Sequence, residues 1–209
     1  MTERAARLTR FSFVAAPALL IVYGSVRLLA PGSKEPGAAW TTGHLAFLLG
    51  VLFFGAACEG LRRMAAASGG PVRRRVARAG MVAGLVGAGA AAAQAVIDLY
   101  AGFRAADKPE MREIFAQVQD VPGVMPVVYT VGPFFLYLGM TALLAALRGR
   151  DAVRSLVLFV LGTAAMASSL DLMPLGGLCY LLAFAPLRRR VSATPVPPAA
   201  PVPVGGATP

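Results

Sequence analysis

Residues 79–100 read AGMVAGLVGAGAAAAQAVIDLY, and this stretch decides the fold class. It contains one charged side chain, Asp98, and one amide, Gln94, among apolar and small residues. An α-helix rises about 1.5 Å per residue, so a helix of this length crosses a hydrocarbon layer about 30 Å thick. The stretch therefore predicts a transmembrane helix.

The remaining chain repeats this pattern. Of the 209 residues, 57% are hydrophobic and 14% are charged, whereas roughly 25% of an ordinary soluble domain is charged. We therefore predict an all-α fold, a polytopic membrane protein with one six-helix transmembrane bundle over residues 11–190. The predicted spans are residues 11–30, 41–60, 79–100, 124–147, 153–170 and 172–187.

The first and last spans leave alternatives open. Residues 11–30 follow a basic start, as a cleaved signal peptide does, but the apolar run is long and Pro31 follows it directly. We therefore predict an uncleaved helix. The last apolar stretch is interrupted by Asp171 and by nearby Pro and Gly, so we predict a short hairpin of two helices, 153–170 and 172–187. Five spans is the alternative.

Basic side chains test the span count independently. The chain has 20 Lys and Arg against 10 Asp and Glu. With six spans and residues 1–10 in the cytoplasm, fifteen basic side chains fall in cytoplasmic segments and four in outer loops, as the positive-inside rule requires. The fifteen are Arg4, Arg7, Arg10, Arg62, Arg63, Arg73, Arg74, Arg75, Arg78, Arg148, Arg150, Arg154, Arg188, Arg189 and Arg190.

This charge pattern also predicts where the protein lies. We expect a multi-pass protein of the plasma (inner) membrane with both termini in the cytoplasm, in contact with the lipid bilayer. Nucleic acid is excluded as a partner, because the arginines serve orientation. The abundance of Arg, Ala, Gly and Pro is typical of a GC-rich, bacterial genome.

Two segments outside the predicted spans differ from them in composition and patterning. Residues 109–119 predict a short amphipathic helix, which either lies on the outer membrane surface or packs against the bundle. Its apolar face consists of Met111, Ile114, Phe115 and Val118. Residues 191–209 contain six prolines and no charged residue, so we predict a disordered cytoplasmic tail.

Small residues predict where helices pack most closely. Gly80 and Gly84 are spaced four apart on one face of the third span, and such faces let helix backbones approach in lipid. We expect this face to pack inside the bundle, with a homo-oligomer or a membrane protein partner as the alternative. Pro133 predicts a kink in the fourth span. Trp40 is interpreted as an anchor at the membrane interface.

Polar residues gather toward the outer ends of the predicted spans. Ionisable groups are costly in lipid, so each is a candidate for function. The candidate cluster consists of Arg27, His44, Gln94, Asp98 and Asp171. We expect Arg27 and Asp98 to form an ion pair with His44 and Gln94 nearby. Each residue also has a structural explanation at the headgroup level, and a role in holding the bundle together is the favoured one.

The sequence contains no catalytic motif. Cys58 and Cys179 are too few for a zinc site or a disulfide framework, and His44 is the only histidine. We therefore predict no catalytic and no metal-ligating residues, and the composition identifies no cofactor.

Three classes of function fit these observations. The favoured one is a non-enzymatic membrane accessory or binding protein, which needs only the bundle and its polar cluster. The second is a small transporter or permease with an outward-facing polar cavity. The third is a membrane-embedded enzyme acting on a lipid-type substrate, with His44 as a base or metal ligand and Asp98 and Asp171 as its partners.

Overall fold

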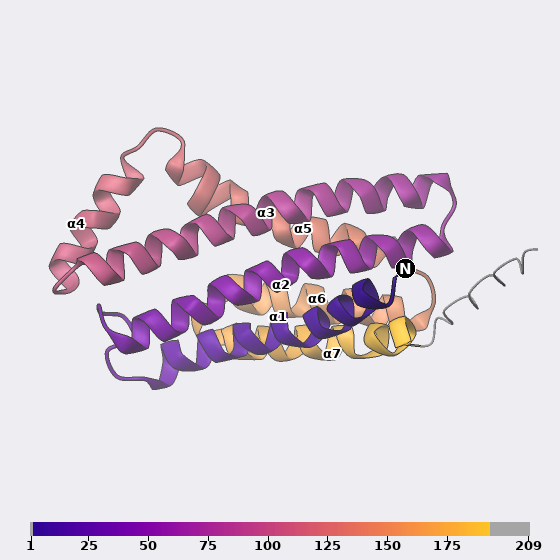
Figure 1. Ribbon diagram of the computed structural model, residues 1–209, viewed down its shortest axis with the longest axis horizontal. Helices are drawn as coiled ribbons and strands as arrows, with labels where there is room; N and C mark the ends of the chain where they lie inside the picture. The colour runs from indigo at the N-terminus through magenta and orange to yellow at the C-terminus, as the bar shows by residue number, and fades with distance from the viewer. Residues whose placement is uncertain (1, 193–209) are drawn as a thin grey trace, which may run out of the picture.

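The computed structural model describes residues 2–192, which form seven α-helices (Figure 1). Six long apolar helical segments could each cross a membrane, so the all-α prediction and the six apolar helices are confirmed. The α-helices are α1 (Glu3–Leu29), α2 (Ala38–Ser68), α3 (Pro71–Arg104), α4 (Lys108–Gln119), α5 (Val131–Ala145), α6 (Arg150–Ser168) and α7 (Met173–Ser192).

Short irregular helices precede α5 and α7. A π-helix, Met125–Thr130, continues into α5, and a 3₁₀-helix, Leu170–Leu172, turns the chain from α6 into α7. The predicted hairpin between the last two long helices is therefore present. Of the predicted tail, residues 191 and 192 belong to α7, and the remainder lies outside the described residues.

Most helices extend beyond the predicted spans toward their arginine-rich ends. Helix α1 begins at Glu3, where the Thr2 hydroxyl accepts a hydrogen bond from the Ala5 N–H. Helix α3 begins at Pro71, and proline is favoured in a first helical turn because its missing N–H is not needed there. Apolar runs mark the part of a helix suited to lipid, so they underestimate its full length.

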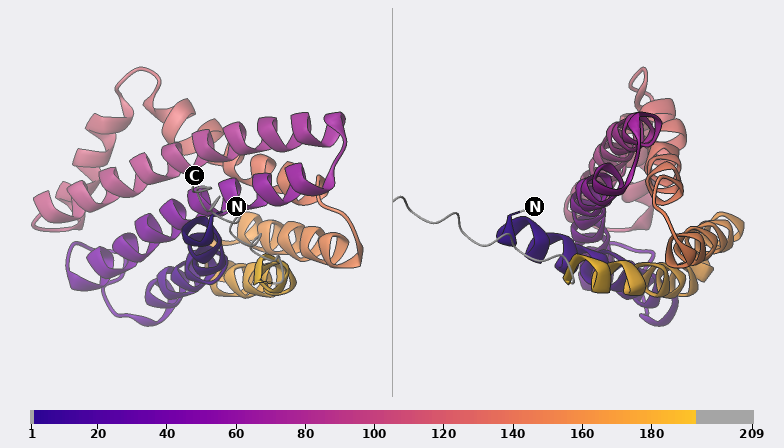
Figure 2. Two further views of the ribbon diagram at one scale, coloured as in Figure 1. Left: turned by 45° about the vertical axis from the view of Figure 1, so that its right-hand side comes forward. Right: turned by 90° about the vertical axis from the view of Figure 1, so that its right-hand side faces the viewer.

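The six long helices form a closed ring. Each packs against its neighbours in chain order, α1 on α2, α2 on α3, α3 on α5, α5 on α6 and α6 on α7, and α7 returns to α1. Figures 1 and 2 show the long helices running roughly side by side, with α7 next to α1. The ring gives the bundle an interior that all six helices share.

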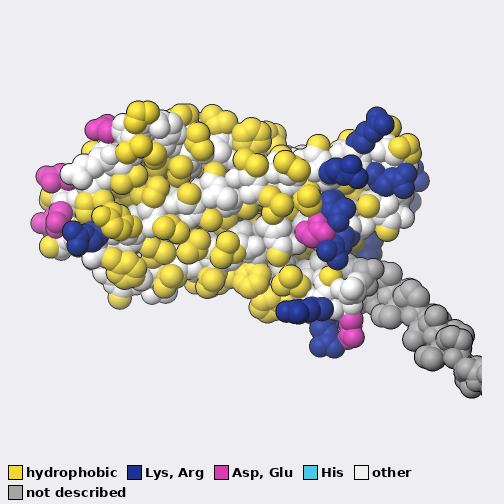
Figure 3. All heavy atoms as spheres, turned by 45° about the horizontal axis from the view of Figure 1, so that its top comes forward, with side chains coloured by type: hydrophobic (Ala, Val, Ile, Leu, Met, Phe, Trp, Pro, Cys, Tyr) yellow, Lys and Arg dark blue, Asp and Glu magenta, His cyan; other side chains and the backbone are white. Residues whose placement is uncertain are grey.

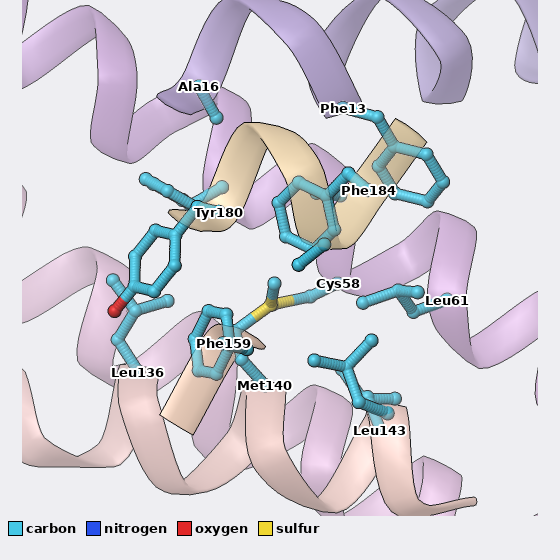
Figure 4. Packing of buried hydrophobic residues seen from close by; sticks show 14 of the residues in the cluster. Phe13, Ala16, Cys58, Leu61, Leu136, Met140, Leu143, Phe159, Tyr180 and Phe184 are labelled. Atoms are coloured by element: carbon cyan, nitrogen blue, oxygen red, sulfur yellow. The ribbon is translucent and has the colours of Figure 1, made fainter. Parts of the chain in front are cut away.

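Aromatic and sulfur-containing side chains fill one half of this interior (Figure 4). Phe159 stacks on Tyr180 with ring centroids 4.3 Å apart, and Phe13 stacks on Phe184 at 5.1 Å. The Cys58 thiol lies 3.3 Å from the Met140 sulfur. All these side chains except Tyr180 lack any hydrogen-bonding group stronger than a thiol, so this half of the core is apolar.

The closest helix contact joins α3 to α5. A Cβ atom added at Gly139 would lie 2.6 Å from the Gly84 Cα, and one added at Gly80 would lie 3.0 Å from the Gly139 carbonyl oxygen. The small-residue face of α3 is thus buried against α5 of the same chain. Packing inside the bundle is the arrangement expected for the Gly80/Gly84 face, and α5 covers that face.

Pro133 lies in the first turn of α5, directly after the π-helix. A proline ring inside a regular α-helix would clash with the carbonyl four residues earlier. The wider π-helical turn at Met125–Thr130 is where the helix departs from regular geometry, so the irregularity predicted at Pro133 occurs just before it.

Helix α4 packs against the end of α3. Met111 is buried against Ala101 and Ala105, with Ile114 and Phe115 half-buried beside it. The predicted amphipathic helix is present, and the structure shows its apolar face packed on the bundle.

Arginines gather at one end of the bundle, where α1 begins and α7 ends (Figure 3). We call this the basic end. Two of these arginines join helices there: Arg73 donates to the carbonyls of Ala146 and Leu147 beyond α5, and Arg190 donates to the Arg148 carbonyl and to Asp151. They satisfy carbonyls that the end of α5 leaves without helical partners.

The contact between α3 and α5 generates a stability prediction. A Cβ at Gly84 would lie 2.6 Å from the Cys58 sulfur, so Gly84→Leu must push the two helices and α2 apart. We expect the substitution to lower the free energy of unfolding by about 1–3 kcal/mol, measured by thermal or denaturant melting in detergent.

Gly89→Leu is the matched control. Gly89 lies on the same helix as Gly84, and replacing either glycine by leucine raises the helix propensity equally. A Cβ at Gly89, however, would meet nothing within 4 Å. Equal melting curves for the two variants would show that Gly84 is not closely packed between α3 and its neighbours.

Candidate functional site

A cavity of about 170 Å³ lies inside the ring, toward the end of the bundle opposite the basic end. All six long helices contribute to its wall. Six of the lining side chains are aromatic: Tyr23, Phe47, Phe54, Tyr137, Phe159 and Tyr180. Gln94 and Asp98, one turn apart on α3, provide an amide and a carboxyl group. The cavity is therefore mostly apolar, with polar groups concentrated at one side.

Asp98 pairs with His44 across the contact between α3 and α2. The His44 Nε2 atom lies 3.6 Å from an Asp98 carboxyl oxygen, and the two side chains are only 7% and 12% exposed. The other ring nitrogen, Nδ1, lies 2.8 Å from the Trp40 carbonyl oxygen. A carbonyl only accepts, so Nδ1 carries the proton and Nε2 faces the carboxyl group.

Trp40 completes this arrangement. Its indole ring stacks on the His44 ring at 3.9 Å, and its Nε1–H donates a 2.8 Å hydrogen bond to the Asp98 backbone carbonyl. The indole lies against Gly102 of α3, where a Cβ atom would clash with the ring. Trp40 thus fixes both partners, His44 from its own helix and Asp98 from α3. The interpretation of Trp40 as only an interface anchor missed this role.

Arg27 pairs with Asp171 instead of with Asp98. The Arg27 Nε atom lies 3.8 Å from an Asp171 carboxyl oxygen, and Asp171 is exposed at the turn before α7. The expected Arg27–Asp98 pair is therefore replaced by two pairs, Arg27–Asp171 and His44–Asp98. The reason is geometric: the ring closes α7 onto α1, which brings the turn carrying Asp171 to the end of α1.

Tyr23 lies between these two pairs. It is one turn before Arg27 on α1, its ring packs edge-on against His44 at 5.4 Å, and it interacts electrostatically with both Arg27 and Asp98. Tyr23 also lines the cavity. Tyr23 therefore joins the polar side of the cavity to the two charged pairs.

The deep side of the cavity carries an internal hydrogen bond. The Thr163 hydroxyl donates to the Phe159 carbonyl at 2.9 Å and lies 2.7 Å from the Tyr180 hydroxyl. A threonine hydroxyl has one proton, so Tyr180 is the donor to Thr163. Tyr180 consequently presents its ring, and not an unsatisfied hydroxyl, to the cavity.

The five residues of the predicted polar cluster do not all lie at the cavity. The structure places Gln94 and Asp98 in the cavity wall, pairs His44 with Asp98, and pairs Arg27 with Asp171. Sequence reasoning missed Trp40 and the aromatic lining. The signal was present in spacing: Tyr23 and Arg27, Trp40 and His44, and Gln94 and Asp98 are each four residues apart, so each pair shares one helix face.

Within residues 2–192, no three His, Cys, Asp or Glu side chains converge as a group that could hold a metal ion. Asp171 lies with Arg27, so the three-residue set of His44, Asp98 and Asp171 is not assembled. Comparison with protein family models, curated proteins and solved structures gives no match to this chain. The functional argument therefore rests on the cavity and its residues.

The pairing generates a prediction about energetic coupling. Asp98→Asn and His44→Asn each remove one partner of a buried pair, while an asparagine amide at position 44 can still donate to the Trp40 carbonyl. We expect each variant to be destabilised, and the double variant to show a coupling energy of about 0.5–3 kcal/mol in detergent melts.

Asp171→Asn provides the control. Asp171 belongs to the exposed pair with Arg27, so its effect should add to that of Asp98→Asn within about 0.5 kcal/mol. Additive effects of the His44 and Asp98 substitutions would contradict the pairing.

Proposed function

We propose that this protein is a non-enzymatic, multi-pass membrane protein that binds a small, mostly apolar molecule in the cavity inside its helix ring. The single observation that carries the proposal is the cavity itself, an aromatic chamber with Asp98 and Gln94 at one side. Ligand sites are typically concave and mainly apolar, with a few convergent polar groups.

The size and lining of the cavity define the ligand class. An apolar cavity of about 150 Å³ in a soluble protein binds benzene, so about 170 Å³ suits one ring with a short substituent. Aromatic faces and a carboxyl group favour a substituent that donates hydrogen bonds or carries positive charge, and they disfavour an anion. We therefore propose a one-ring amine or alcohol as the simplest ligand.

The proposed orientation places the cavity in the outer half of the plasma membrane. The arginine-rich basic end, where α1 begins and α7 ends, lies in the cytoplasm by the positive-inside rule, and we accordingly propose that both termini are cytoplasmic. The His44–Asp98 pair and the cavity lie toward the opposite end.

A transporter would need a polar route through the other half of the bundle. Between the cavity and the basic end, the core is filled by fully buried apolar side chains, among them Cys58, Leu61, Leu143, Phe184 and Leu187. These support a binding function over transport.

An enzyme acting on a lipid-type substrate would need a group that can exchange protons with it. His44 is the natural candidate for a base, but the Trp40 carbonyl and Asp98 face its two ring nitrogens. This arrangement supports a binding role for the pair, since neither nitrogen points to a substrate.

Ligand binding is tested by filling the cavity. Ala91→Leu places a larger side chain in the cavity wall, and we expect it to abolish binding of 2-phenylethylamine and 2-phenylethanol, measured by calorimetry on the purified protein in detergent. Thermal melting should change little, because the added atoms enter existing space. 2-Phenylacetate should bind neither form, because its carboxylate would meet Asp98.

Ala93→Leu is the control, because Ala93 lies on the same helix but is exposed. It should leave binding unchanged. Asp98→Asn should reduce the preference for the amine over the alcohol. Absence of binding to the unaltered protein, or equal binding by the Ala91 and Ala93 variants, would contradict the proposed site.

The orientation is tested by labelling in whole cells. Cys58→Ala and Cys179→Ala remove the natural thiols, and single cysteines are then placed at Ala106 and at Gly70, which are both exposed. A membrane-impermeant maleimide should label position 106 in intact cells and position 70 only after permeabilisation. The reverse pattern would overturn the proposed topology.

A further inference from the structure

A second hollow lies on the outside of the ring, in the seam between α1 and α7. It is a groove of about 600 Å³. Its walls are apolar, formed by Phe13 and Val14 from α1 and by Leu181, Leu182, Phe184 and Ala185 from α7. Its end nearest the basic end is lined by Arg188 and Arg189. The groove is therefore apolar along its length and cationic at one end.

The spacing of side chains along α7 explains why the groove is apolar along its length and cationic at one end. Leu181, Ala185 and Arg189 are spaced four residues apart, so they follow one face of the helix. From Leu181 to Arg189 the helix rises about 12 Å. A groove of this length accommodates the upper half of a lipid acyl chain, while the two guanidinium groups lie at the level where its phosphate would be.

Charge at the basic end favours an anion in this position. Among the described residues this end holds fifteen arginines and three carboxylates, Glu3, Glu59 and Asp151, so its net charge is strongly positive. Arginine binds phosphate with two parallel hydrogen bonds, a geometry that a lysine lacks. The guanidinium groups of Arg188 and Arg189 thus complement the phosphate of a lipid that lies in the groove.

We propose that the α1–α7 groove binds one anionic phospholipid, with an acyl chain along the apolar walls and the phosphate on Arg188 and Arg189. Apolar walls specify a lipid over a soluble phosphate, and the arginine pair specifies an anionic headgroup over a zwitterionic one. The site is distinct from the cavity inside the ring, and the proposal does not depend on the ligand of that cavity.

The test compares lipids on the purified full-length protein in neutral detergent. Native mass spectrometry should show one phosphatidylglycerol molecule retained, with weaker retention of phosphatidylcholine of the same chain length. R188Q/R189Q should reduce phosphatidylglycerol binding roughly tenfold or more, as expected for loss of charged hydrogen bonds. R74Q/R75Q removes equal charge from exposed positions on α3, outside the groove, and should retain binding.

A second variant keeps both arginines of the groove and obstructs the lipid acyl chain. Ala185 is exposed in the groove wall, so Ala185→Trp should fill the groove, reduce phosphatidylglycerol retention and leave thermal melting without lipid unchanged. Equal losses in the two arginine double variants, equal retention of both lipids, or full retention by the Ala185 variant would overturn the proposal. Glycerol 1-phosphate raising the melting temperature as much as phosphatidylglycerol would also overturn it, because the arginines would then bind phosphate alone.

Discussion

A helix that is long and apolar enough to cross a hydrocarbon layer must satisfy its own backbone groups, and this constraint underlies the rest of the structure. A backbone N–H or C=O group in lipid has no water to bond, so a spanning segment must be a helix or belong to a closed barrel. The six long apolar helices meet this demand within themselves. Their association then depends on packing between side chains, because lipid supplies no hydrophobic drive between helices. The α3–α5 contact, where Gly80, Gly84 and Gly139 bring two backbones together, follows directly from that constraint.

The close approach of α3 to α5 leaves space elsewhere inside the ring. The ring closes because α7 packs on α1, and the interior that results is filled by large side chains on the side of the basic end, including Phe13, Phe184 and Leu187. Toward the opposite end the same interior remains hollow, and there α3 presents Gln94 and Asp98 in place of apolar residues. The cavity and the polar pair therefore arise from a single architecture, in which small residues set the helix spacing and aromatic residues line what is left.

The polar groups of this region satisfy one another in two pairs of different character. His44 and Asp98 are buried; Trp40 accepts a hydrogen bond from the His44 ring on its own helix and donates one to the Asp98 backbone carbonyl on α3. Arg27 and Asp171 instead meet at a turn where Asp171 is exposed. A buried pair costs desolvation and gains geometric precision, while an exposed pair contributes little to stability. The first pair thus has a fixed geometry beside the cavity, whereas the second pair only marks where the turn before α7 meets α1.

The sequence by itself determined the all-α class and the six apolar helices, because both follow from local features: the length of each apolar run and the polar residues between runs. It also predicted the amphipathic helix at 109–119, since the spacing of its apolar residues repeats within one or two helical turns. Only the tertiary structure decided which helices pack against each other. It replaced the expected Arg27–Asp98 pair with two others, buried the Gly80/Gly84 face against α5, and gathered aromatic residues from separate helices around one cavity. Such outcomes depend on the order of helices around the ring and on the rotation of each about its axis, and neither is encoded in the periodicity of any single segment.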